Sequence, residues 1–119
     1  MSTVFRTTLV AASMTLSLAI ARPVLAGVQD AAQIAKGQAV YAAQKCSMCH
    51  SIEGKGSKSN PLDGVGTKIS ADDIKQWITH PVDAAAKAKS TKKPLMPAKW
   101  ASMPPADLDA LVAYLSSLK

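Results

Sequence analysis

Cysteine is scarce in this chain: it occurs twice, and both copies lie within "KCSMCHS" at positions 45–51. Two cysteines can form one disulfide at most, so a disulfide-stapled secreted scaffold is excluded. The sequence after residue 26 also contains no Phe, and its large aromatic residues are two Tyr and two Trp. A domain this small and this poor in aromatics makes a marginal core, so we expect a bound group to fill its middle.

A long hydrophobic run is also missing. Residues 1–8 carry one basic residue and no acid, and the apolar run 9–20, "LVAASMTLSLAI", is too short to span a bilayer comfortably. The small-residue pattern ending at Ala26 completes a secretory signal peptide of residues 1–26, which leaves a single domain at 27–119. The sequence therefore predicts a periplasmic protein without stable membrane insertion if the signal is cleaved; an uncleaved anchor is the alternative.

Arginine is missing from the predicted domain, because Arg6 and Arg22 both precede residue 27. Of the 14 basic residues in the chain, the twelve lysines remain and face eight acidic residues. This mildly basic balance suits an acidic protein partner or an anionic surface. Without arginine, and without aromatics interleaved among the lysines, the sequence gives no support for nucleic-acid binding.

The periodicity of apolar residues predicts an all-α domain. Residues 30–45, 70–81 and 104–118 read as three principal helices, and 83–95 as a further turn or two of helix before a loop. Residues 53–68 hold four glycines and a proline, which indicates a loop, and no run alternates with a period of two. We expect a helical domain with long irregular connections.

Local residue choice supports these helices. Ser70 is an expected N-cap and Pro105 an expected first-turn residue. Apolar stripes are expected along each helix, formed by Ile34, Gly37 and Tyr41 in the first, Ile74, Trp77 and Ile78 in the second, and Leu108, Leu111, Val112, Leu115 and Leu118 in the last.

The cysteine segment at positions 45–51 is compatible with several kinds of chemistry. A thiol oxidoreductase carries Cys-x-x-Cys after a strand, and no strand is expected here. Zinc needs four ligands, and the chain offers Cys46, Cys49, His50 and His80, but His50 directly follows Cys49 and cannot easily share one tetrahedron with it. A structural disulfide would leave His50 without a role. Cys-x-x-Cys-His is the signature of c-type haem attachment. Cys46 and Cys49 would form thioethers to the two haem vinyl groups, and His50 would be the proximal iron ligand.

The order of "GQAVY", "CSMCH", "NPLDGVG", "WITHP", "LMP" and "LVAYLSSLK" resembles the small monohaem class I c-type cytochromes over residues 30–118. The resemblance implies one covalent haem c within a cytochrome c-like fold. It implies that the carbonyl of Pro61 accepts a hydrogen bond from His50 and that Leu62 and Val65 pack on the haem. It also implies that the helix of Gly37 and Tyr41 crosses the last helix near Leu111 and Tyr114. Trp77 and Trp100 are expected to shield the haem, and either indole N–H is a candidate donor to a haem propionate.

The sixth iron ligand decides between electron transfer and open-site chemistry. The resemblance favours Met96, from its distance to Tyr114 in the last helix. Met103, at the start of that helix, and His80 are the alternatives, with a packing role for Met103 and a solvent-facing role for His80. Met48 lies within the attachment segment and cannot reach the far side of the iron.

These expectations lead to a one-electron carrier, rather than an enzyme, with iron held by His50 and Met96. The alternatives are a haem subunit of a periplasmic dehydrogenase or oxidase complex and a haem enzyme or gas sensor with a labile sixth ligand. Seven lysines are expected to rim the haem edge, either as a docking face for an acidic redox partner or as ordinary solvated residues: Lys45, Lys55, Lys58, Lys68, Lys92, Lys93 and Lys99.

Overall fold

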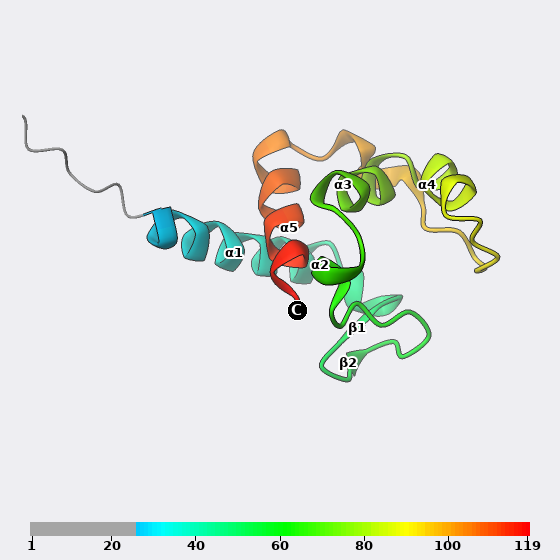
Figure 1. The fold of residues 1–119 in the computed structure, drawn as a ribbon, viewed down its shortest axis with the longest axis horizontal. Coiled ribbons are helices and arrows are strands. Elements are labelled where there is room, and N and C mark those ends of the chain that lie inside the picture. The colour runs from blue at the N-terminus through cyan, green and yellow to red at the C-terminus, as the bar shows by residue number, and fades with distance from the viewer. Residues whose placement is uncertain (1–25) are drawn as a thin grey trace, which may run out of the picture.

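The computed structural model describes residues 26–119, and the domain they form is predominantly helical, as predicted (Figure 1). The predicted signal peptide falls on residues 1–25, outside the described part, and on Ala26, the first residue of the first helix. The α-helices are α1 (Ala26–Ala43), α2 (Val65–Lys68), α3 (Ala71–Thr79), α4 (Pro81–Lys87) and α5 (Pro105–Ser117). Two 3₁₀ turns, η1 (Cys46–Met48) and η2 (Ala98–Ser102), and a hairpin of β1 (Ser51–Ile52) and β2 (Lys55–Gly56) complete the order.

The crossing of α1 and α5 is the main packing contact of the fold, and Figure 1 shows the two helices lying across each other. Gly37 is buried where they meet, and a Cβ at this position would overlap the carbonyl oxygen of Ala110 and lie 2.6 Å from the Cβ of Tyr114. The rings of Tyr41 and Tyr114 meet edge to face, with centroids 5.9 Å apart. The predicted crossing of the first and last helices is confirmed.

The predicted apolar stripe of α5 forms the centre of the core. Leu108, Leu111, Val112 and Leu115 are all buried, and Leu118 packs partly buried against them. Ile74 and Ile78 of α3 and Tyr41 of α1 complete the buried cluster. At about 25 cal/mol per Å² of apolar surface, burial of such side chains supplies most of the stabilisation of so small a core.

Helix α3 begins as predicted, because the side chain of Ser70 accepts a hydrogen bond from the backbone N–H of Asp73 at 3.1 Å. It ends at Thr79, and Pro81 then opens α4 rather than only terminating α3. Proline suits a first helical turn because its missing N–H would have no partner there. His80 lies between the two helices with a non-helical backbone, so α3 and α4 form an angled pair.

The segment predicted as loop, 53–68, contains some regular structure. β1 and β2 pair antiparallel, with Ser51 opposite Gly56, and α2 adds a single helical turn. Gly56 has φ +105°, and a Cβ there would overlap the carbonyl oxygen of His50, so only glycine fits this turn. The hairpin is too short for a period-two pattern to reveal it.

Three ion pairs on the surface link neighbouring helices. Lys36 pairs with Asp107 at 2.9 Å between α1 and α5, and Lys75 pairs with Asp109 at 3.2 Å between α3 and α5; Lys87 pairs with Asp73 between α4 and α3. Exposed pairs of this kind contribute little to stability. Among residues 26–119, no helix combines the length and apolar character that crossing a membrane requires.

Candidate functional site

The cysteine segment forms a tight turn directly after α1. Lys45 adopts a left-handed backbone, which ends the helix, and η1 then brings the N–H groups of Cys49 and His50 to the carbonyl of Cys46 at 3.1 and 3.0 Å. Side chains three residues apart eclipse one another in a 3₁₀ turn, so Cys46 and Cys49 lie on one face. Both thiols are free, which contradicts the disulfide reading. Burial raises the pKa of the half-buried Cys46 thiol.

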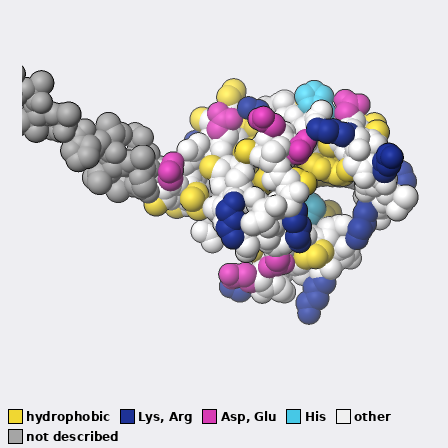
Figure 2. Space-filling model, viewed as in Figure 1, with side chains coloured by type: hydrophobic (Ala, Val, Ile, Leu, Met, Phe, Trp, Pro, Cys, Tyr) yellow, Lys and Arg dark blue, Asp and Glu magenta, His cyan; other side chains and the backbone are white. Residues whose placement is uncertain are grey.

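A cavity of about 710 Å³ opens beside this turn. In the view of Figure 1, the cysteine turn and the loop of residues 57–62 form the lower side of the cavity. Helix α3 and the loop of residues 90–97 form its upper side. Figure 2 shows the hollow on this face, bordered by lysine side chains. The lining is mainly apolar and of the size typical of a cofactor site, with His50 and Cys49 among its few polar groups.

The imidazole of His50 lines the cavity, and a hydrogen bond from one of its ring nitrogens fixes its orientation. Its Nδ1 lies 3.1 Å from the carbonyl oxygen of Asn60, and because a carbonyl only accepts, Nδ1 carries the proton and Nε2 keeps a free lone pair. Burial lowers the pKa of His50, which also favours the neutral ring that binds a metal. The side chain of Asn60 donates in turn to the carbonyl of Cys49 at 3.3 Å.

The acceptor is therefore Asn60, and the expectation that Pro61 fills this role is wrong. Pro61 is exposed and bridges to Ser51 in a short parallel contact, and Leu62 N–H donates to the Ser51 carbonyl at 2.8 Å. These contacts turn the Asn60 carbonyl, one residue earlier, toward the imidazole. The sequence indicates only that Asn60, as the residue before a proline, favours an extended conformation; it does not indicate which carbonyl faces the ring.

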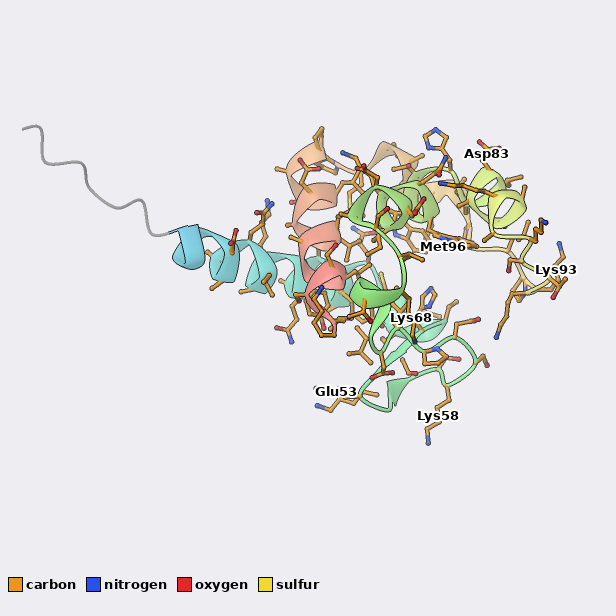
Figure 3. All side chains as sticks on the ribbon, viewed as in Figure 1. Glu53, Lys58, Lys68, Asp83, Lys93 and Met96 are labelled. Carbon is orange, nitrogen blue, oxygen red and sulfur yellow. The ribbon has the colours of Figure 1, made fainter. Side chains whose placement is uncertain are left out.

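The candidate sixth ligands differ in their position relative to the cavity. Met96 is half-buried and lines the same cavity as His50, and Figure 3 shows it at the centre of the molecule beside α3. Met103 does not line this cavity and packs against the core at the start of α5, as its alternative role predicted. His80 is exposed and hydrogen-bonds Thr79 at 2.8 Å. Met48 lines the mouth of the cavity with 74% of its surface exposed.

Of the expected haem surroundings, the structure brings Leu62, Val65, Trp77 and Trp100 to the cavity wall. Pro61 is not part of that wall. The indole N–H of Trp100 donates to the side-chain oxygen of Gln44 at 3.0 Å, a partner that the sequence reading missed.

The lysines of the expected rim have varied surroundings. Lys92 and Lys93 line the cavity mouth, and the Lys92 ammonium donates to the carbonyl of Ser59 at 3.3 Å across it. The Lys99 ammonium lies 4.5 Å from the centre of the Trp100 ring. The remaining four, Lys45, Lys55, Lys58 and Lys68, do not line the cavity, and Figure 3 shows Lys58 pointing away from the molecule. The mouth therefore carries positive charge, contributed by fewer lysines than expected.

The alternative chemistries find no support in the described part of the chain. Within residues 26–119, no cluster of three or more His, Cys, Asp or Glu is placed to hold a metal ion, as zinc would need. The cysteine turn follows a helix rather than a strand, unlike a thiol oxidoreductase. A wide apolar cavity with the Cys49 thiol, an imidazole nitrogen and a thioether in its wall, and with the Cys46 thiol in the adjoining turn, fits a haem c.

Comparison with known proteins agrees with this fit. The family model described as "Cytochrome c" matches residues 34–119, which includes the cysteine turn, the cavity and α5. No curated protein and no solved structure matches the chain.

Proposed function

The chain belongs to the cytochrome c family, whose members carry covalently attached haem c, and from this premise we propose that it is a periplasmic one-electron carrier with His50 and Met96 as axial iron ligands. The haem, when bound, supplies an iron that accepts and releases one electron. The residues that line the cavity would hold the haem ring, orient the two iron ligands and exclude water.

One observation carries the ligand proposal: His50 and Met96 line a single apolar cavity. The hydrogen bond from Nδ1 to Asn60 fixes the orientation of the imidazole and raises its basicity. A thioether ligand from Met96 together with His50 would raise the potential of a bound haem and leave no open position for small molecules. Such a closed site would suit a carrier rather than a haem enzyme or gas sensor.

The two methionines provide a matched test. In the oxidised wild-type protein, sulfur ligation should give a weak charge-transfer band in the far red. Met96→Ala should abolish this band, lower the reduction potential and admit cyanide or carbon monoxide, while the haem stays attached through Cys46 and Cys49. Met103→Ala should keep the band and cost only packing. A wild-type protein without the band that binds carbon monoxide readily would contradict the carrier proposal.

The lysines at the cavity mouth support a partner with an acidic docking surface. Lys92 and Lys93 lie beside the site through which an electron would pass, and positive charge there would steer an acidic protein toward it. The proposed periplasmic location rests on the leader-like residues 1–26. N-terminal sequencing of the purified protein tests it, since cleavage after Ala26 leaves Gly27 first; a start at Met1 would favour the anchor.

The second candidate is a haem subunit within a larger redox complex. A large exposed apolar patch beside the cavity would favour it, and among residues 26–119 the mouth carries Met48, which is 74% exposed, as a single exposed apolar side chain. The mass of the native protein after gentle purification distinguishes the two: a monomer supports the free carrier, and co-purification with a larger subunit supports the complex.

A further inference from the structure

The loop that carries Met96 has little regular structure of its own. It runs from the end of α4 at Lys87 to η2 at Ala98 and forms the upper wall of the cavity. A segment held by few contacts opens easily, so the groups that fix its ends decide how long it stays closed. Four residues after Met96, the Trp100 indole N–H donates to Gln44.

This hydrogen bond joins the two halves of the site. Gln44 directly follows α1, just before the turn that bears Cys46, whereas Trp100 lies in η2, directly after the Met96 loop. The indole N–H is a donor only and has a single proton to give, so one acceptor satisfies it completely. The contact spans 56 residues of sequence, and it links the histidine side of the cavity to the methionine side.

The hydrogen bond lies at the surface, but the Trp100 ring that donates it is anchored against the core. The ring is half-buried and packs against the core cluster, and the Lys99 ammonium lies over it at 4.5 Å. A ring held in this way has its N–H aimed in one direction. Removing the Gln44 oxygen would exchange this bond for one to water and release the ring edge from the end of α1, which favours the open loop.

We propose that Gln44 and Trp100 are a positioning pair that keeps the Met96 loop closed over the cavity. The pair touches neither the iron ligands nor the cysteines through this bond; it acts by holding the loop against the end of α1. Its effect at the iron rests on the proposed ligation by Met96, whereas its effect on the loop does not.

The test uses the haem-loaded protein with a change at Gln44 and a control at a glutamine of the preceding helix. Gln44→Ala removes the acceptor, and Gln38→Ala removes an exposed glutamine of α1. Loss of one hydrogen bond of about 1 kcal/mol raises the open population about fivefold. We therefore expect backbone amides at 92–99 to exchange hydrogen about fivefold faster in Gln44→Ala, and imidazole to bind the oxidised protein faster by the same factor. Gln38→Ala should leave both rates unchanged.

Two further variants distinguish the bond from a general loss of packing. Gln44→Glu keeps an acceptor oxygen and should restore slow exchange. Trp100→Phe removes the donor while keeping an aromatic ring, and in that background Gln44→Ala should have no additional effect. Equal rates in Gln44→Ala and the wild type, or full additivity in the double variant, would overturn the proposal.

The two readouts separate this proposal from the ligand assignment. If the wild-type protein lacks the far-red band, the assignment of Met96 fails, but hydrogen exchange at 92–99 still shows whether the pair holds the loop. If the band is present and exchange in Gln44→Ala is unchanged, the assignment stands and the positioning pair is refuted.

Discussion

Replacing Gly37 by alanine tests the helix crossing on which the fold depends. In an open helix this change would stabilise the protein by about 1 kcal/mol, because glycine is a poor helix former. Here the new methyl group would overlap the Ala110 carbonyl and lie 2.6 Å from the Tyr114 Cβ. Overpacking costs about 1–3 kcal/mol, and the upper end applies because a backbone carbonyl cannot rotate away.

The net effect of Gly37→Ala is then a loss of about 2 kcal/mol, which is 3 of steric cost less 1 of helix propensity. For a domain of this size that corresponds to a melting temperature lower by about 8–16 °C. Thermal unfolding of the haem-loaded protein, followed by circular dichroism, measures it. Ala35→Gly, at an exposed position of α1, calibrates the propensity contribution. A Gly37→Ala protein as stable as the wild type would refute the close crossing.

Three further changes test individual contacts. The Tyr41 hydroxyl is buried without a partner, so Tyr41→Phe should stabilise the fold by about 1 kcal/mol in denaturant unfolding, whereas Tyr114→Phe should be nearly neutral. Burial raises the pKa of Tyr41 from 10.0 to about 12; the folded state therefore holds this proton more tightly, and wild-type stability should fall between about pH 10 and 12, less steeply in Tyr41→Phe. Lys92→Ala should speed amide exchange at residues 57–60 about twofold, and Lys93→Ala, which removes the same charge, should not. Ser70→Ala should cost about 1 kcal/mol of stability through loss of the α3 cap.

Sequence reading was most successful where the signal was local or periodic. The stripe of α5 follows the 3.6-residue repeat, and its members are the buried core. Ser70 caps α3 because the cap bond spans three residues and needs no knowledge of the rest of the chain. The cysteine motif identified its cofactor because haem attachment demands that spacing of residues.

The contacts that sequence reading missed join remote segments. The His50 imidazole reaches Asn60 rather than Pro61 because the path of the intervening hairpin decides which carbonyl faces the ring. Trp100 and Gln44 meet only because the Met96 loop returns to the end of α1. Neither partner follows from spacing along the chain. A hydrogen bond has a tolerance of a few tenths of an ångström, so a shift of one residue in a loop exchanges one acceptor for the next.

The helix crossing also has a consequence for how the chain is made. Gly37 leaves the ribosome 73 residues before Ala110, its contact in α5. At 5–20 residues per second, that interval is about 4–15 s, during which the buried face of α1 has nothing to pack against. The same order holds if the chain is threaded N-terminus first through a membrane pore. Cys46 and Cys49 are synthesised within this interval, so both thiols precede the helix against which α1 packs.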